Sequence, residues 1–294
     1  MPHWQTVSRR TFLASTGVAI ATASLQPWPL RAADSSPKKR SLKKAIMYET
    51  IRLKGSVHEK FQAVKAAGFE GIEPMGGMNQ SEVLKARDDA GLQCASVCCH
   101  THWQKPITDP DPAVREIGLN GLRQSLRDAK AYGASSVLFV PAVVNKNVSY
   151  ADAYTRSQTE IRKVLPLAEE LGVKIAIENV GNHFLLSPLE AARYIDEFNS
   201  PAIGWHFDIG NVMAIGWPDH WIHVLGKRIQ KLHIKEYARG KRANFLEGDN
   251  DWPTIMKALD DIGYNGWGIA EQPGADSPEG LKDLSDRMTK IFAS

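Results

Sequence analysis

The sequence predicts a closed barrel of eight parallel strands, each followed by a helix, in one domain preceded by an export signal. From residue 43 onward, short apolar runs alternate with amphipathic stretches, and eight such pairs fit within about 250 residues. Polar residues also end four consecutive strands near the C-terminus. In a barrel these ends surround one mouth, whereas in a doubly wound open sheet, the alternative, they would spread along a line. The barrel is therefore the preferred prediction.

The predicted strands are short apolar runs separated by turn signals. The segment 137–140 is continuously apolar, which is typical of a strand covered on both faces. The strands are expected at residues 44–49, 71–75, 93–99, 135–141, 174–179, 203–208, 229–235 and 266–271.

The predicted helices lie between these strands and carry start and stop signals. Ser187-Pro188 precedes one of them, and glycines such as Gly91, Gly133 and Gly172 follow helix ends. The helices are expected at residues 57–67, 80–90, 112–132, 152–171, 188–198, 217–226, 253–263 and 278–292. The longest irregular connection, 235–252, is either a substrate-covering loop or a solvated charged loop.

The N-terminus has the pattern of a twin-arginine export signal. Arg9 and Arg10 stand directly before a weakly apolar stretch, and Ala32-Ala33 is a possible cleavage site. The stretch is too short to span a bilayer, so no stable membrane insertion is expected after signal removal. A disordered basic N-terminus is the alternative. The expected organisation is a signal at 1–33, a linker at 34–42 and a barrel at 43–294, with the protein periplasmic or secreted.

The distribution of charge argues against nucleic-acid binding. Residues 1–44 carry eight basic side chains and one acidic side chain, a net charge of +7. Because the whole chain has a formal charge of +3, residues 45–294 carry −4. The basic character thus belongs to the leader, and the barrel lacks the positive charge that DNA or RNA binding needs.

The three cysteines, Cys94, Cys98 and Cys99, lie in one predicted strand. An odd number of cysteines in one strand is a poor disulfide framework, and neighbouring strand residues point to opposite faces. We expect these thiols to be buried and chemically inert.

Four polar side chains at consecutive strand ends carry the functional prediction. They are Glu178, Asp208, His233 and Glu271. Burying such groups without partners is costly, so their recurrence indicates a shared ligand. Three carboxylates and one imidazole suit Mn²⁺ as the expected ion, with Mg²⁺ or Co²⁺ as alternatives and Zn²⁺ less favoured. The residues therefore predict a divalent-metal site at the barrel mouth.

Further candidates line the same mouth. Glu73 lies in the second predicted strand, and we expect it to contact a substrate. His100, His102 and His183 lie in loops where they are either mouth residues or ordinary loop histidines. His206, two residues before Asp208, is expected inside the barrel one layer deeper.

The motifs around these residues resemble those of the xylose-isomerase-like TIM-barrel superfamily, and within it the sugar isomerases and epimerases that include D-tagatose 3-epimerase and L-ribulose-5-phosphate 3-epimerase. The resemblance covers about residues 43–292. The motifs are Glu178-Asn179, His206-Phe207-Asp208-Ile209-Gly210-Asn211, His233-Ile234-Lys235 and Ala270-Glu271-Gln272-Pro273.

The resemblance implies that the four polar residues bind a metal and that Glu178 and Glu271 are also an acid/base pair. It implies a substrate contact for Arg239, six residues after His233. Many of these epimerases have a histidine where this chain has Asn211, which keeps hydrogen-bonding capacity but no charge, and we expect Asn211 to contact the substrate.

The expected activity is isomerisation or 3-epimerisation of a ketose or keto-sugar by proton transfer through a metal-stabilised enediolate. A lyase or hydratase acting on 3-keto-glycosides uses the same site and is the first alternative. A non-catalytic sugar-binding protein is the second, and an endonuclease of the same superfamily conflicts with the acidic barrel. The resemblance also implies a homo-oligomer.

Overall fold

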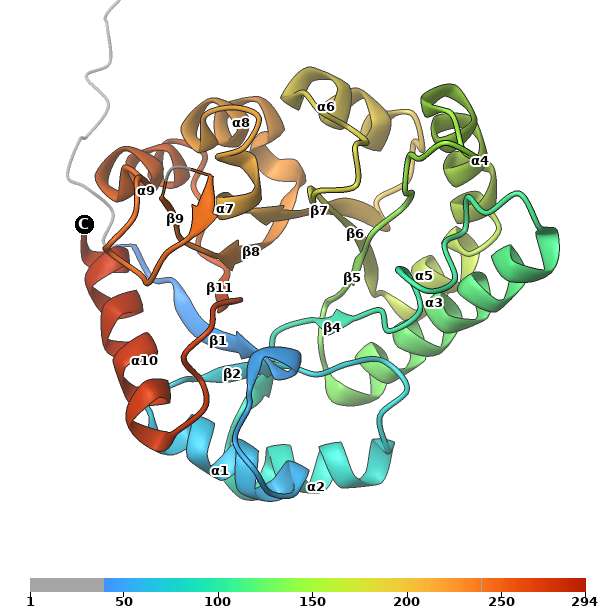
Figure 1. Ribbon diagram of the computed structural model, residues 1–294. Coiled ribbons are helices and arrows are strands. Elements are labelled where there is room, and N and C mark those ends of the chain that lie inside the picture. The colour runs from blue at the N-terminus through green and yellow to red at the C-terminus, as the bar shows by residue number, and fades with distance from the viewer. Residues whose placement is uncertain (1–39, 239) are drawn as a thin grey trace, which may run out of the picture. The chain divides into compact units, whose positions relative to one another are not determined.

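The computed structural model describes residues 40–238 and 240–294, and it forms a parallel β-barrel surrounded by helices (Figure 1). The predicted signal at 1–33 and most of the predicted linker lie outside the described residues. The barrel strands are β1 (Lys43–Met47), β2 (Gly71–Glu73), β3 (Gln93–Cys94), β4 (Val97–Cys98), β5 (Ser136–Phe139), β6 (Lys174–Glu178), β7 (Ile203–Asp208), β8 (Ile229–Ile234) and β11 (Trp267–Ala270).

The strand order confirms the predicted barrel. In the described chain the strands follow the order β3-β2-β1-β11-β8-β7-β6-β5-β4, and their pairing is parallel throughout. Strands β3 and β4 are two halves of the third predicted strand. The amide of Ala95 donates to Ile72 at 2.9 Å and that of Cys99 donates to Leu138 at 3.0 Å, so this strand joins β2 to β5 and closes the barrel.

The helices cover the outside of the barrel (Figure 1). Ser56 begins α1 with a reciprocal capping box, and Gly91 and Gly133 end α2 and α3 in the left-handed conformation that glycine adopts at low cost. The helices are α1 (Val57–Ala66), α2 (Gln80–Ala90), α3 (Pro112–Tyr132), α4 (Tyr150–Arg162), α5 (Leu165–Leu171), α6 (Pro188–Asp196), α7 (Ile209–Val212), α8 (Pro218–Leu225), α9 (Trp252–Asp261) and α10 (Pro278–Ala293).

The prediction of one continuous helix between the fourth and fifth predicted strands is wrong. The segment expected as one helix at 152–171 is divided into α4 and α5. Pro166 lies in the first turn of α5, where its missing N–H is harmless. In an unbroken helix its ring would collide with the carbonyl group of Arg162, four residues earlier, so the chain ends α4 and starts again.

The described part of the long connection after β8 is held in place by hydrogen bonds. It contains a small antiparallel hairpin of β9 (Tyr237–Ala238) and β10 (Lys241–Arg242). The buried carboxylate of Glu236 holds the loop, because it accepts hydrogen bonds from the Leu246 amide at 2.9 Å and the Trp252 indole at 2.7 Å. The loop thus presents its hairpin beside the strand ends.

The three cysteines are free and buried, as predicted. Burial raises the pKa of the Cys94 thiol to about 12, which keeps it protonated near neutral pH. In the part of the chain that is described, no helix is both long and apolar enough to cross a membrane.

The packing of α3 against the barrel predicts a stability difference between two of its residues. Leu122 is 0% exposed, whereas Ile117 on the same helix is 48% exposed. Leu122→Ala leaves a cavity and should lower the free energy of unfolding by about 2–5 kcal/mol. Ile117→Ala, the matched control, should change it by less than about 0.5 kcal/mol. Urea denaturation measures both, and equal losses would contradict this account of the core.

Candidate metal and sugar site

Four predicted site residues meet at the carboxyl ends of adjacent strands. Glu178 ends β6, Asp208 ends β7, His233 lies near the end of β8, and Glu271 directly follows β11. One donor atom from each residue lies within 4.8 Å of the others. The convergence that the sequence predicted is therefore present, and its cause is the parallel order β6-β7-β8-β11.

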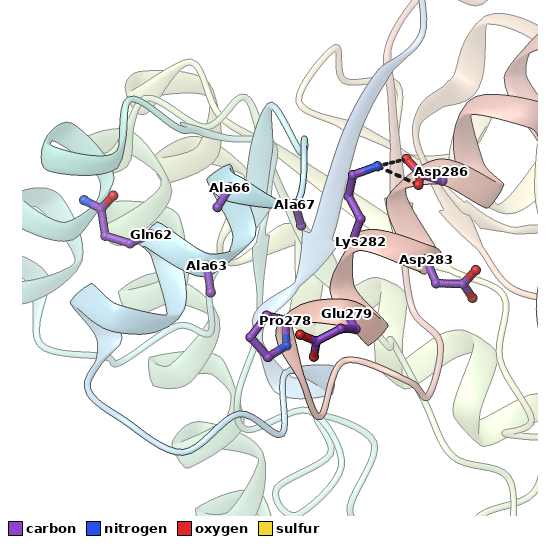
Figure 2. Close-up of a pocket in the computed structure, with 9 residues that line it drawn as sticks. All are labelled: Gln62, Ala63, Ala66, Ala67, Pro278, Glu279, Lys282, Asp283 and Asp286. Carbon is purple, nitrogen blue, oxygen red and sulfur yellow. Dashed lines mark hydrogen bonds and ion pairs between the residues drawn. The ribbon is translucent and has the colours of Figure 1, made fainter.

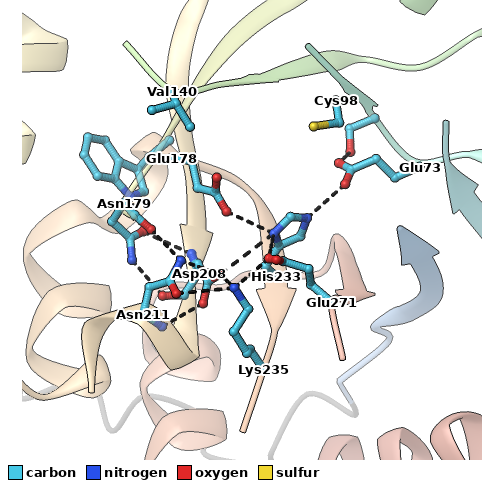
Figure 3. Close-up of polar contacts among 12 residues, drawn as sticks. Glu73, Cys98, Val140, Glu178, Asn179, Asp208, Asn211, His233, Lys235 and Glu271 are labelled. Carbon is cyan, nitrogen blue, oxygen red and sulfur yellow. Dashed lines mark hydrogen bonds and ion pairs between the residues drawn. The ribbon is translucent and has the colours of Figure 1, made fainter. Parts of the chain in front are cut away.

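His233 lies at the centre of this cluster (Figure 3). Its Nδ1 is 3.1 Å from Glu178 Oε1 and 2.8 Å from Glu271 Oε2. Its Nε2 is 2.9 Å from Glu73 Oε2, on the opposite side of the ring. Burial alone would lower the pKa of His233, but Glu73, Glu271 and Glu178 together raise it well above its usual value. The imidazolium form thus donates to carboxylates from both nitrogens.

A second buried cation, Lys235, lies beside the cluster. Its Nζ is 2.7 Å from Asp208 Oδ2 and 2.7 Å from Glu271 Oε2. Burial opposes its charge, yet Asp208 and Glu271 raise the pKa of the ammonium group. Lys235 belongs to the motif His233-Ile234-Lys235, but no role was predicted for it. Its spacing of two residues from His233 on one strand, which puts both side chains on the same face, was the available signal.

The ends of β6 and β7 are held by amide groups. Asn179 Oδ1 accepts from the Asp208 amide and from the Trp205 indole, both at 3.0 Å. Asn211 Nδ2 donates to Asp208 Oδ2 at 2.7 Å, and Lys235 Nζ donates to Asn211 Oδ1 at 3.3 Å. Asn211 lines the cavity, and its amide also orients Asp208. Its contact with a substrate stays a prediction.

Gly210 permits the close approach of α7 to β8. A Cβ at this position would lie 2.7 Å from Lys235 Cβ, a distance that real side chains do not tolerate. A larger residue would therefore displace Lys235 from the carboxylates.

Glu73 has a different place from the one predicted. We expected it to contact the substrate, but it is 0% exposed and lies behind His233. Its other oxygen accepts a short hydrogen bond from Ser96. This position suits orientation of the imidazole, which is the usual role of a carboxylate behind a histidine ligand. Arg239, the other predicted substrate contact, lies outside the described residues.

The two predicted acid/base residues differ in protonation. Burial raises the pKa of Glu178 to about 7, and hydrogen bonding to His233 only partly opposes this. Burial also acts to raise the pKa of Glu271, but the charges of His233 and Lys235 outweigh it and lower that pKa. In the metal-free protein the two carboxyl groups thus have opposite pKa shifts, a division typical of paired acids and bases.

A cavity of about 420 Å³ opens above these residues. Its charged lining residues include Glu178, His233, Lys235 and Glu271, with Tyr237 and Arg242 from the hairpin. Cys98, His102, Trp103 and Leu138 also line it.

A larger groove of about 850 Å³ lies in the outer helical layer between α1 and α10 (Figure 2). Its floor is formed by small residues such as Ala63 and Ala66, and its polar side chains include Lys282, which pairs with Asp286. No cluster of metal-binding donors among the described residues lies there. The smaller cavity at the strand ends is therefore the candidate site.

The donors at the strand ends fit a divalent cation. Three carboxylates and one imidazole within 4.8 Å offer the oxygen-rich set that Mn²⁺, Mg²⁺ and Co²⁺ accept. Burying these acids without cations would be costly, and in this structure His233 and Lys235 offset their charge. The identity of the ion stays a prediction.

The raised pKa of Glu178 predicts a pH-dependent stability in metal-free protein. Between about pH 4.5 and about pH 7 the unfolded chain ionises Glu178 more readily than the folded protein does. The free energy of unfolding therefore falls as pH rises through this range. The glutamine in Glu178→Gln cannot ionise. The free energy of unfolding of this variant should therefore increase relative to that of wild type as pH rises over that range, by at most about 1.4 kcal/mol per pH unit. Thermal unfolding in EDTA from pH 5 to pH 8 measures this. The control Glu170→Gln alters an exposed residue, and a flat difference for both variants would refute the assignment.

The contacts of Lys235 predict that its ammonium group competes with a metal ion for Asp208 and Glu271. Lys235→Met should destabilise metal-free protein by about 3–5 kcal/mol, because it leaves buried carboxylates without their partner. The same change should strengthen Mn²⁺ binding by about tenfold, since no ammonium group then competes for Asp208 and Glu271. Calorimetry measures the binding. The control Lys231→Met removes a buried lysine that bonds Ser135 instead, and equal effects of both variants would contradict the competition.

Comparison with known proteins agrees with the fold and the motifs. The family model described as xylose isomerase-like TIM barrel matches residues 61–291. The L-ribulose-5-phosphate 3-epimerase UlaE of Escherichia coli K12 is 23% identical over 261 residues, covering 79% of this chain and 90% of that protein.

Solved structures show the same architecture. The apo 3-keto-D-glucoside 4-epimerase YcjR from Escherichia coli superposes with a TM-score of 0.74 at 20% identity, covering 86% of this chain and 100% of that one. The D-psicose 3-epimerase of Clostridium cellulolyticum H10, solved with D-tagatose, gives a TM-score of 0.71 at 18% identity, covering 86% and 99%. With the family match across most of the barrel, these likenesses confirm the resemblance seen in the motifs: the chain belongs to the xylose isomerase-like TIM-barrel family.

Proposed function

We propose that the protein is a divalent-metal-dependent sugar isomerase or 3-epimerase. The observation that carries the proposal is the convergence of four donor groups, within 4.8 Å of one another, at one cavity: Glu178, Asp208, His233 and Glu271. Moving a proton off a carbon and returning it needs one base and one acid within reach of the same substrate. The epimerase names of the relatives support this reaction class.

Glu178, Asp208, His233 and Glu271 would hold the ion, with Mn²⁺ proposed first, Mg²⁺ or Co²⁺ as alternatives and Zn²⁺ less favoured. A bound divalent cation supplies Lewis acidity that polarises a carbonyl group and stabilises negative charge on its oxygen.

The protein side chains provide the proton transfers. The carboxylate of Glu271, which contacts Lys235, accepts the proton from the carbon next to the carbonyl group. Glu178, which lines the same cavity, returns a proton to the substrate. His233 stays in place because Glu73 fixes its far nitrogen.

We propose a ketose or a keto-sugar derivative as the substrate. Relatives named for L-ribulose 5-phosphate, D-psicose and a 3-keto-glucoside share carbonyl-containing sugars as their named substrates. The proposed twin-arginine signal favours an unphosphorylated sugar, since export would separate the protein from cytoplasmic sugar phosphates. Detection of a mature N-terminus near Ala33 in the periplasm would support the export proposal, and intact Met1 there would contradict it.

The lyase alternative shares the proton abstraction and differs in the product. A 3-keto-glycoside that loses its leaving group after abstraction indicates a lyase, and an epimerised product indicates an epimerase. Product analysis by NMR on 3-keto-glycosides and free ketoses in Mn²⁺ buffer separates the two. Saturable sugar binding without turnover would instead indicate a non-catalytic binding protein.

Glu271→Gln tests the assigned base. Glutamine keeps the size of the side chain but cannot accept a proton, so exchange of the substrate α-hydrogen with deuterated solvent should fall by at least about 100-fold. Folding, followed by circular dichroism, should be largely preserved. The control Glu279→Gln changes an exposed glutamate of α10 and should exchange at the wild-type rate. Undiminished exchange in Glu271→Gln would exclude this residue as the base.

A further inference from the structure

His102 lies across the barrel mouth from the charged cluster. It follows β4, which belongs to the third barrel strand, and His233 lies on β8. In the described barrel the third strand and β8 are four strands apart in either direction. Both residues line the same cavity, so His102 faces it from the side opposite β8.

The ring of His102 is fixed by its surroundings. It is 5% exposed, and its Nδ1 accepts a hydrogen bond from the Val140 amide at 3.3 Å. Trp103 packs edge-on against it at 5.6 Å between ring centroids, and Phe139 lies at 6.3 Å. Because Nδ1 is an acceptor, the neutral ring carries its proton on Nε2.

The remaining nitrogen is available to a ligand. No described residue accepts a hydrogen bond from His102 Nε2. Among the described residues, some polar atoms are fully buried and have no partner, but His102 Nε2 is not one of them. The residue lines the cavity. Burial lowers the pKa of His102 to about 3, so the ring is uncharged in neutral solution. An uncharged N–H donor suits a hydroxyl or carbonyl oxygen of a ligand better than it suits a charged ligand group.

The neighbouring wall makes this donor selective. Next to His102 the cavity is lined by Cys98, Trp103 and Leu138, which offer apolar surface and a weakly polar thiol. A single strong donor in an apolar wall fixes the orientation of a ligand, because a misplaced hydroxyl group loses its hydrogen bond there.

Resting on the proposed function, we propose that His102 orients the sugar by donating a hydrogen bond from Nε2 to one of its uncharged oxygens, on the side of the cavity opposite His233. His102 thereby determines which sugars bind productively. It takes no part in the proton transfers, which stay with Glu178 and Glu271.

The test compares His102→Leu, His102→Gln and His100→Leu in Mn²⁺ buffer. Loss of the donor in His102→Leu should raise the Kd and KM for the preferred ketose by about tenfold to 100-fold, with a smaller effect on kcat. His102→Gln keeps an N–H donor and should recover part of the loss. His100→Leu makes the same change at an exposed residue of the same loop and should leave both constants unchanged. Mn²⁺ affinity, measured by calorimetry, should be equal in all variants.

Monodeoxy sugars identify the contact itself. For the deoxyketose that lacks the contacted hydroxyl group, His102→Leu should bind as well as wild type, whereas other deoxyketoses should show the full loss. If a carbonyl oxygen is the acceptor, every deoxyketose keeps the full loss and the corresponding polyol, which lacks the carbonyl group, shows none.

The outcomes separate the inference from the proposed function. An unchanged Kd in His102→Leu, or equal losses for every deoxyketose and the polyol, would overturn the role of His102. Sugar binding without hydrogen exchange or turnover in wild type would overturn the proposed reaction, while the binding comparison still decides on His102. Absence of ketose binding to wild-type protein would overturn both. If His102→Leu unfolds, the comparison of His102→Gln with wild type on the same sugars gives the decision.

Discussion

The contact of His233 with three carboxyl groups, two buried and one partly buried, is the interaction on which the site depends. Glu178, Glu271 and Glu73 surround one imidazole, and none of these acids has a large share of its surface in water. Such groups remain in a folded interior only if cations offset their charge. His233 and Lys235 provide that charge. Removal of either would leave carboxylates at the site without a cationic partner.

The same charge balance explains why two similar glutamates differ chemically. Glu271 contacts both His233 and Lys235, and the two cations favour its ionised form. Glu178 contacts His233 but no lysine in the described chain, and burial dominates its pKa. The environment of each carboxyl group, and not its residue type, therefore sets the direction of its pKa shift.

The barrel supplies the geometry that this balance requires. Parallel strands put the carboxyl ends of β6, β7, β8 and β11 at one edge, and the amide of Asn179 links the ends of β6 and β7. Across the mouth, the chain after β4 holds His102 against the Val140 amide. His102 and the charged cluster thus lie across one cavity from each other.

The sequence by itself determined the order of the elements and the four residues that meet, because apolar periodicity and strand ends are local features. It did not determine that Pro166 divides a helix, since the pattern on both sides remains amphipathic. Only the tertiary structure decided the partners: Glu73 lies behind His233, 160 residues away in the chain, and Lys235 lies between Asp208 and Glu271. Which side chains share a proton or a charge depends on distances across the barrel, and those distances arise only when the strands close around it.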